Sequence, residues 1–248
     1  MKNNDLVSII TPCYNASKTI DRCIRSVLNQ SYNNWEMIIV DDFSTDDSES
    51  KVESYDDDRI KSYKNASNSG PAASRNHAIS YAQGRYLMFL DADDEWHEEK
   101  IMNQVRFMKE NDYYFTFTAY NRVKENNYNK IKVLETVDYK NLKRNTTIYT
   151  STVCIDRNTV KEIKMKKVYY DDLICWLELL NYYGPAYSIN EALVNYYVTE
   201  GSVSSNKLKS SIKVFQIYNE CLEDSYLRNF IDWLFYSYHG VKKYYFSE

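Results

Sequence analysis

Apolar and polar segments alternate through the first 110 residues in the order expected of strands and helices. Four apolar runs have the length of short strands, and the segments between them carry apolar residues at helical spacing. The predicted strands are 6–11, closed by Pro12, then 35–40, 60–63 and 86–90. The predicted helices are 18–28 with Ser17 as N-cap, 72–83 with Gly84 as C′ residue, and 97–111. Strand, helix and strand at this spacing form βαβ units, so we expect a parallel sheet.

The pattern changes after Asn111. The following residues are aromatic and partly alternating, which favours longer, antiparallel strands. The strand candidates there are 113–123, 150–155 and 194–198. A further helix is predicted from Asp171, with Gly184 as its stop, and 207–248 is predicted to be helical.

The C-terminal helical segment carries one apolar stripe. Its residues follow one another at steps of four and three: Leu227, Ile231, Leu234, Tyr238, Val241 and Tyr245. We favour packing of this stripe against the rest of the chain. Contact with a membrane surface or with a partner helix is the alternative.

Composition and charge exclude several classes of protein. The 248 residues are 44% hydrophobic and 27% charged, which is ordinary for a globular protein. The net charge is −4 and no long basic tract occurs, which argues against nucleic acid as a partner. Five cysteines without paired spacing predict free thiols in a reducing compartment. Neither a signal peptide nor an apolar run near 18 residues is present, so we expect a cytoplasmic protein.

The central strand runs directly into acidic residues, in Tyr86-Leu-Met-Phe-Leu-Asp-Ala-Asp-Asp-Glu95. Ligands of open α/β sheets collect where strands end, and Asp91 and Asp93 could hold Mn²⁺ or Mg²⁺ together with a diphosphate. Alternatively, such residues form solvated turns or helix caps. Because three carboxylates within four residues repel one another, we favour the metal site.

Other polar residues occupy comparable positions. Asp41 and Asp42 end the second strand and could accept hydrogen bonds from a uracil or a ribose, with turn capping as the alternative. Arg75 lies in the first turns of a helix, where it could bind a diphosphate or could be an ordinary surface residue. Asp171 and Asp172 could simply cap their helix.

Four separated motifs occur in one order: Ser8-Ile-Ile-Thr-Pro-Cys-Tyr-Asn15, Val40-Asp-Asp-Phe-Ser-Thr-Asp-Asp-Ser48, Gly70-Pro-Ala-Ala-Ser-Arg-Asn76 and Asp91-Ala-Asp-Asp94. Together they resemble the inverting family 2 glycosyltransferases of the GT-A fold. That fold is α/β, with a Rossmann-like nucleotide-binding sheet of mostly parallel strands, here with a C-terminal helical extension. The resemblance divides the chain into a nucleotide-sugar-binding half (1–110), an acceptor-binding half (111–205) and a helical extension (206–248).

The resemblance also implies roles for matching residues. Residues implied in nucleotide binding are Pro12, Tyr14, Asn15, Asp41, Asp42, Arg75 and Asp91. Asp91 and Asp93 are implied as the pair that orders the ribose and the metal-bound diphosphate. Asp171-Asp172, with Trp176 four residues beyond the second, is similar to the acidic helix start that supplies the catalytic base. Asp172 is the first choice for the base and Asp171 the second.

Two departures from the family pattern matter. The family often has Tyr-Arg-x-His where this chain has Tyr196-Tyr-Val-Thr199, so Thr199 stands in place of a histidine that is sometimes a metal ligand. The Gln-x-x-Arg-Trp signature of processive synthases is also missing, which favours addition of one sugar at a time.

The implied partners are a UDP-sugar donor and a glycan or lipid-linked acceptor of bacterial surface polysaccharide (capsule, O-antigen or lipooligosaccharide). Peripheral contact with the cytoplasmic face of the inner membrane is a further expectation. An aspartate-nucleophile phosphatase, a nucleotidyltransferase and an inactive nucleotide-binding scaffold of a polysaccharide assembly complex are the alternatives.

Overall fold

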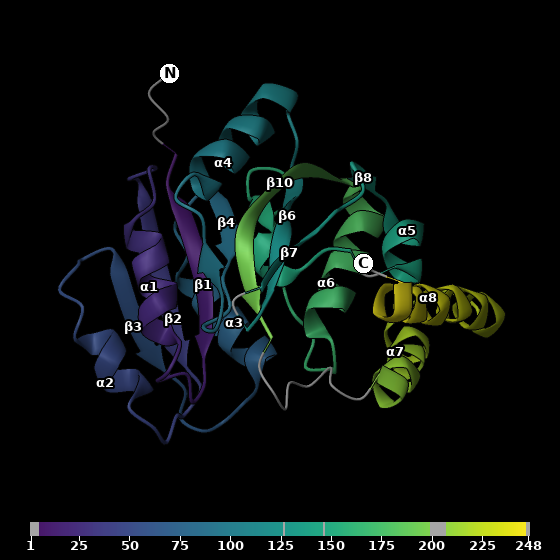
Figure 1. Cartoon of the computed structure of the whole chain (residues 1–248), viewed down its shortest axis with the longest axis horizontal. Helices are drawn as coiled ribbons and strands as arrows, with labels where there is room; N and C mark the ends of the chain where they lie inside the picture. Colours follow the sequence, from purple (N-terminus) through teal and green to yellow (C-terminus); the bar gives the residue numbers. More distant parts are fainter. Residues whose placement is uncertain (1–4, 126, 146, 199–206, 247–248) are drawn as a thin grey trace.

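The computed structural model describes residues 5–125, 127–145, 147–198 and 207–246, with side chains from 210 to 240 in the last segment. One mixed sheet runs through the molecule and helices cover both of its faces (Figure 1). The strands are β1 (Val7–Cys13), β2 (Trp35–Asp41), β3 (Ile60–Lys64), β4 (Tyr86–Phe89), β5 (Glu95–Trp96), β6 (Phe115–Lys124), β7 (Asn127–Ile131), β8 (Thr136–Val137), β9 (Cys154–Asp156) and β10 (Ala186–Tyr197). The helices are α1 (Ile20–Leu28), α2 (Ser48–Glu53), α3 (Pro71–Tyr81), α4 (Lys100–Asn111), α5 (Tyr139–Arg144), the 3-10 helix η1 (Thr150–Thr152), α6 (Asp171–Tyr183), α7 (Lys207–Cys221) and α8 (Tyr226–Phe246).

The first four strands form the parallel half of the sheet, as predicted from the βαβ pattern. The strand order is β3-β2-β1-β4-β9-β6-β10-β5, with β7 paired to β6 and β8 paired to β10. Ile10 lies opposite Phe89 and Cys13 lies opposite Asp41. The carboxyl ends of β1, β2 and β4 therefore meet at one edge of the sheet.

The second half of the sheet is mixed. β9 pairs antiparallel with both β4 and β6, and β6 and β7 form an antiparallel pair, as expected for the segment after Asn111. β10, however, runs parallel to β6. A parallel pair needs a long crossover connection, and the segment from β7 to β10, which contains α5 and α6, provides it.

Successive residues of the central strands pack against opposite layers of helices. Ile10 and Phe89 belong to the core that contains Trp176 of α6, and the Phe89 and Trp176 rings lie 5.1 Å apart. Ile9 and Met88 belong to the core formed with α1 and α4. Because both faces are buried, these strands are continuous apolar runs without alternation.

The prediction that Pro12 closes the first strand is wrong, since β1 continues to Cys13. Leu90 N–H donates to the Ile10 carbonyl, so Ile10, and with it Pro12 two residues later, faces the β4 side of β1. β4 ends at Phe89, opposite Ile10. Pro12 therefore faces a position where no ladder donor is needed.

Two predicted helix boundaries are also wrong. The N-cap of α1 is Thr19, and the amide of Ser17 donates instead to the Asp46 carboxylate at 3.0 Å. Helix α3 ends at Tyr81, three residues before Gly84. The amide of Gly84 donates to Ser8 Oγ at 2.8 Å, and a Cβ there would lie 2.6 Å from the Ser8 nitrogen. Close approach to β1, not a left-handed helix end, therefore requires this glycine.

The segment 150–155, predicted as one strand, is divided. Thr150–Thr152 form the 3-10 helix η1, and only Cys154–Asp156 pair in the sheet. Two hydroxyls of η1 bond to carboxylates of the candidate site described below, which an extended strand would not direct to the same side.

The apolar stripe of the C-terminal helix does not pack inward. Leu227, Ile231, Leu234 and Tyr238 are exposed on α8, whereas Asn229 and Asp232 are buried. The favoured prediction of packing against the chain is therefore wrong for these residues; the side chains of Val241 and Tyr245 lie outside the described part. Among the helices that the structure describes, none combines the length and apolar composition needed to cross a membrane.

Candidate active site

The loops after β1 and β2 are fastened together beside the end of the sheet. Asn15 has a left-handed backbone, with φ 46°, which asparagine tolerates better than most residues. Its amide donates to Ser44 Oγ at 2.9 Å, and its side-chain oxygen accepts from the Thr45 amide at 2.9 Å. Half-buried Pro12 lies just before this loop, next to the last residue of β1, and the Tyr14 side chain is 51% exposed. A rigid loop pair thus presents an aromatic ring to solvent.

The two aspartates after β2 have different environments, although both are buried. Asp41 accepts from the Ser44 amide at 2.9 Å through one oxygen, and its other oxygen, Oδ1, is buried without a partner among the described residues. Asp42 accepts from Asn65 Nδ2 at 2.7 Å and from the Ser69 and Gly70 amides at 2.9 and 2.7 Å. The Asp42 carboxylate therefore organises the loop before α3, and Asp41 is the one with an unused acceptor.

Arg75 joins the end of β4 to the start of α6. Arg75 is 6% exposed, and its guanidinium donates to Asp91 at 2.6 Å and to Asp171 at 2.9 Å. Burial alone would lower the pKa of Arg75, but Asp91 and Asp171 raise it above its ordinary value, so the side chain stays charged. Arg75, the residue predicted to bind the diphosphate, is thus held between two carboxylates that are 80 residues apart in the sequence.

Acidic residues crowd at the end of β4. Burial, and then the charge of Asp91, raise the pKa of Asp93 to about 6. Asp94 is fully buried, and burial together with Asp93 and Asp91 holds its pKa well above the usual range. It accepts hydrogen bonds from Ser151 Oγ and, at 2.7 Å, from Tyr149 OH. The third carboxylate of the motif thus points into the protein, and Asp91 and Asp93 remain for a ligand.

Asp91 and Asp93 suit a divalent cation whose other coordination positions are filled by substrate and water. In the described part of the chain no three His, Cys, Asp or Glu side chains are grouped tightly enough to hold a metal by themselves. Mg²⁺ sites often use one or two carboxylates with substrate phosphates and water. Burial is the main cause of the raised pKa of Asp93 and the charge of Asp91 adds to it, and a bound cation would oppose both effects.

The two aspartates at the start of α6 have different partners: Asp171 forms an ion pair, and Asp172 accepts hydrogen bonds from neutral groups. Asp171 is 6% exposed and bonded to Arg75, yet burial raises its pKa to about 6. Half-buried Asp172 accepts from Thr150 Oγ1 at 2.6 Å and from the Leu173 amide at 2.8 Å. The residue before the pair, Tyr170, has a left-handed backbone with φ 61° and makes no side-chain cap bond. Asp171 therefore does not act as a conventional cap.

Comparison with known proteins identifies the family. The model of "Glycosyl transferase family 2" matches residues 8–163. The chain belongs to this family. It is 39% identical over 246 residues to the "Putative teichuronic acid biosynthesis glycosyltransferase TuaG" of Bacillus subtilis (strain 168), covering 96% of this chain and 97% of that one. It is 34% identical to the "UDP-Glc:alpha-D-GlcNAc-diphosphoundecaprenol beta-1,3-glucosyltransferase WfgD" of Escherichia coli, covering 98% and 96%.

Two solved structures show the same fold. TarS of S. aureus in complex with UDP-GlcNAc gives a TM-score of 0.71 at 20% identity, covering 97% of this chain and 73% of that one. The mannosyltransferase PcManGT of Pyrobaculum calidifontis, in complex with GDP-Man and Mn²⁺, gives a TM-score of 0.69 at 16% identity, covering 100% of this chain and 77% of that one. The expected GT-A fold is confirmed, and the chain is a glycosyltransferase. The phosphatase and nucleotidyltransferase interpretations are wrong.

In this family 2 glycosyltransferase, several residues around η1 contact the candidate site but were not predicted from the sequence. Tyr149 bonds to Asp94, Thr150 to Asp172, and Ser151 to Asp94 while accepting from the Asp91 amide at 3.1 Å. Consecutive residues thus connect the end of β4 to the start of α6. The hydroxyl-rich run Thr-Thr-Ile-Tyr-Thr-Ser-Thr at 146–152 was the only signal for them.

A second missed group lies where β10 approaches the acidic motif. Arg22 donates to the Asp93 carbonyl at 2.6 Å, and its guanidinium lies 3.5 Å from the centre of the Tyr197 ring. Tyr197 OH donates to Glu95 at 2.7 Å. Thr199, which stands where the family often has a histidine, lies outside the described residues, so its effect on the metal stays a prediction.

Proposed function

We propose that this glycosyltransferase moves one sugar at a time from a UDP-sugar to a lipid-linked glycan acceptor, with inversion at the anomeric carbon. The observation that carries the proposal is the Arg75 bridge, which joins Asp91 at the end of β4 to Asp171 at the start of α6. It supports a single site in which donor-binding and proton-accepting carboxylates face one another.

For the donor, we assign the nucleoside to the loops after β1 and β2. The unpartnered Oδ1 of Asp41 suits the imide N–H of uracil, and the exposed ring of Tyr14 suits stacking against the base. TarS, which shares the fold, has been crystallised with UDP and with UDP-GlcNAc. Asp42 stays a predicted contact, although its carboxylate is already bonded to the loop before α3.

For the diphosphate, we assign Asp91 and Asp93 as ligands of Mn²⁺ or Mg²⁺. When bound, the cation would neutralise charge on the departing UDP. Arg75 orients Asp91 through one carboxylate oxygen, and Arg22 holds the backbone of Asp93 through its carbonyl. The PcManGT complex contains Mn²⁺, which supports a divalent cation in this fold.

Asp172 is our choice for the general base. Asp171 is bonded to Arg75, so accepting a proton would weaken a buried ion pair. Asp172 has no such partner in the described part of the chain, and Thr150 and the Leu173 amide fix its orientation. It would take the proton of the acceptor hydroxyl while that oxygen attacks the sugar from the face opposite UDP.

For the acceptor, two relatives indicate the class. WfgD acts on α-D-GlcNAc-diphosphoundecaprenol, and TuaG is assigned to teichuronic acid biosynthesis. We therefore propose a lipid-linked acceptor of a bacterial surface polysaccharide, reached from the cytoplasmic face of the membrane by peripheral contact.

The proposal is tested by titrating UDP into the purified protein in a calorimeter, with Mn²⁺ and then with EDTA. We expect binding that requires the metal and that survives Asp172→Asn. UDP release is then measured with a panel of UDP-sugars and a short-prenol GlcNAc-diphosphate acceptor. Binding of UDP without turnover of any donor would favour the inactive scaffold, and failure to bind UDP would refute the donor assignment.

A further inference from the structure

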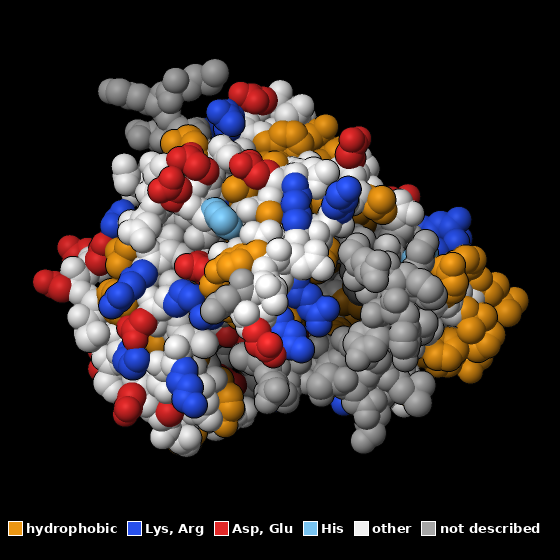
Figure 2. All heavy atoms as spheres, viewed as in Figure 1, with side chains coloured by type: hydrophobic (Ala, Val, Ile, Leu, Met, Phe, Trp, Pro, Cys, Tyr) orange, Lys and Arg blue, Asp and Glu red, His pale blue; other side chains and the backbone are white. Residues whose placement is uncertain are grey.

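Helix α8 presents its apolar side to solvent. Its exposed apolar residues recur at steps of three and four, as on one face of an amphipathic helix. They are Tyr226, Leu227, Phe230, Ile231, Leu234, Phe235 and Tyr238, with exposed fractions from 39% to 68%. We call this set the α8 apolar face. Hydrophobic side chains gather there at the right edge of the molecule in Figure 2. Soluble proteins rarely expose so many adjacent large apolar side chains unless something binds them.

The opposite side of α8 fixes this orientation through charged groups. Lys143 of α5 is fully buried and lies 2.6 Å from Asp224 and 3.3 Å from Asp232. Arg144 donates to Asp232 at 2.6 Å, and Asn229 accepts from Lys143 at 2.7 Å. Turning the apolar face inward would withdraw Asp232 from both cations and leave buried charge unpaired. The outward apolar face is therefore part of the folded state.

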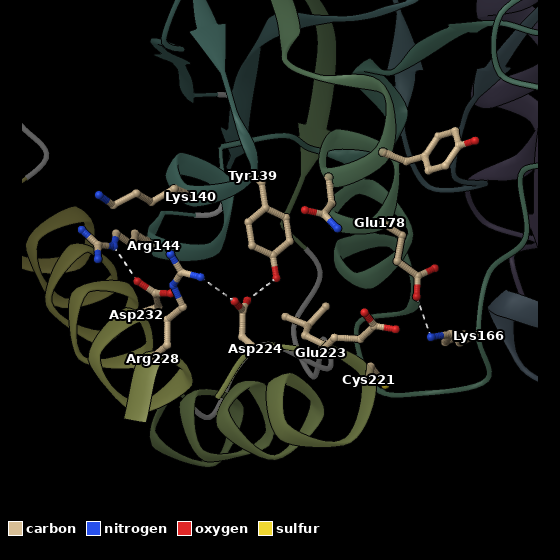
Figure 3. A pocket seen from close by; sticks show the side chains of 13 residues that line it. Tyr139, Lys140, Arg144, Lys166, Glu178, Cys221, Glu223, Asp224, Arg228 and Asp232 are labelled. Carbon is tan, nitrogen blue, oxygen red and sulfur yellow. Dashed lines mark hydrogen bonds and ion pairs between the residues drawn. The ribbon is translucent and has the colours of Figure 1, made fainter. Parts of the chain in front are cut away.

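The pocket beside this anchor does not explain the exposed face. A cavity of about 720 Å³ lies between α5, α6 and the α7–α8 hairpin (Figure 3). Most of the charged side chains that line it have partners: Asp224 bonds to Tyr139 and Arg228, and Lys166 pairs with Glu178. None of the residues of the α8 apolar face lines it.

The charges of α8 indicate the chemistry of the partner. Asp232 is the only acidic residue of the helix, and it is buried against Lys143 and Arg144. The helix also contains Arg228, whose side chain is 71% exposed, together with Lys242 and Lys243. In a chain of net charge −4, this helix is cationic and has no exposed acid among its described side chains.

We propose that the α8 apolar face is a docking surface for an anionic lipid bilayer, on which the helix lies in the plane of the headgroups. Leu, Ile and Phe enter the acyl boundary, the tyrosines suit the interface, and the positive charge of the helix, with exposed Arg228, attracts anionic headgroups. Pairing α8 with α8 of a second copy would instead bring two cationic helices together, without an exposed acidic group among the described side chains of either to balance them.

Helix α8 is connected to the proposed acceptor site through α7, an argument that rests on the proposed function. Helix α7, which pairs with α8 in the hairpin, contacts the turn before the α6 carboxylates: Lys213 Nζ lies 3.6 Å from the centre of the Tyr169 ring. Docking through α8 would thus bring the start of α6 near the membrane, where a lipid-linked acceptor is held.

The test is flotation of the full chain with vesicles of equimolar phosphatidylcholine and phosphatidylglycerol, and with phosphatidylcholine alone. We expect binding to the anionic vesicles that weakens with salt. The double variant Leu227→Ser/Leu234→Ser should bind about tenfold more weakly or worse. Leu134→Ser is the matched control, because Leu134 is 49% exposed and Leu234 is 48% exposed, but Leu134 lies in the loop before β8.

Several results would overturn the proposal. They are absence of wild-type binding to the anionic vesicles, equal binding by the double variant, and a concentration-dependent dimer without lipid that the double variant abolishes. UDP binding and turnover of a short-prenol acceptor are measured on the same proteins without vesicles, and both should be unchanged in the double variant. If the wild type shows no turnover, the proposed function fails, and flotation still decides the docking surface. Arg228→Gln is the second variant, and it should lower binding to anionic vesicles only.

Discussion

Two buried cations bridge pairs of carboxylates in this protein, and their surroundings differ. Arg75 joins Asp91 and Asp171 in the candidate active site, and Lys143 joins Asp224 and Asp232 at the C-terminal hairpin. At the hairpin, Arg144 and Arg228 add positive charge. Burial would raise the pKa of Asp224, but hydrogen bonds from Lys143 and Tyr139 hold it below its usual range.

In the candidate active site, carboxylates outnumber the cations that contact them. Asp93, Asp94 and Asp172 are added to the Arg75 pair, and the pKa values of Asp93 and Asp171 are raised to about 6, chiefly by burial. The comparison teaches that a buried network with balanced charges has a structural role, whereas uncompensated negative charge indicates a place for a bound ligand. The following changes test that distinction, from the largest expected effect to the smallest.

Asp172→Asn removes the proposed base without changing the size of the side chain. We expect turnover to fall by about two to four orders of magnitude, because a positioned proton acceptor contributes that much. UDP affinity should not change. Steady-state kinetics and calorimetry measure the two quantities. Asp232→Asn, in the hairpin network, is the control: it should lower stability but leave turnover per folded molecule intact. Unchanged turnover in Asp172→Asn would sink the assignment.

Lys143→Met tests the satisfied network. It removes the fully buried ammonium between Asp224 and Asp232, which keep only more exposed arginines as ion-pair partners, so the free energy of unfolding should fall by about 3–5 kcal/mol. Urea denaturation followed by circular dichroism measures the change. Lys140→Met on the exposed side of the same helix should have little effect. A fall below 1 kcal/mol for Lys143→Met would mean that the network does not anchor the hairpin.

Lys100 is a second fully buried lysine, but it has a neutral partner. Its ammonium donates to Gln104 at 2.6 Å and lies 4.3 Å from the centre of the Trp96 ring, and burial lowers its pKa from 10.5 to about 7. Between these values the unfolded chain binds more protons than the folded one. Wild-type stability should therefore rise with pH from about 7, by at most about 1.4 kcal/mol per unit.

Lys100→Met should remove that rise and be more stable than the wild type at pH 7 and below. Thermal unfolding of both proteins between pH 6 and 9 checks this, with exposed Lys124→Met as the control. Parallel pH profiles for Lys100→Met and the wild type would contradict the assignment.

Thr150→Val removes one hydroxyl between η1 and the proposed base. A hydrogen bond to a charged group contributes about 1.5 kcal/mol or more, so kcat should fall about tenfold while the KM for the donor changes little. Thr136→Val, at an exposed position of β8, should be silent. If the KM of the donor rose while kcat stayed constant, Thr150 would act on donor binding and not on the base.

Much of this site could be predicted because strand ends and motif order are local properties. The apolar run 86–90 had to be a buried strand, which placed Asp91 and Asp93 at its carboxyl end. The separation of roles within Asp41-Asp42 and within Asp171-Asp172 could not be predicted. It depends on partners as remote as Gly70, Arg75 and Thr150, and sequence spacing does not indicate which carboxylate each will meet.

The sequence by itself determined the parallel half of the sheet, the positions of its acidic ends and the apolar stripe of α8. Only the tertiary structure decided that Thr150–Thr152 form a 3-10 helix joining two carboxylate groups and that the stripe faces outward. The physical reason is the same in both cases. Periodicity determines which residues share a face of a helix. A polar face becomes buried only when groups elsewhere in the chain form ion pairs or hydrogen bonds with it. Lys143 and Arg144 do this for the polar side of α8.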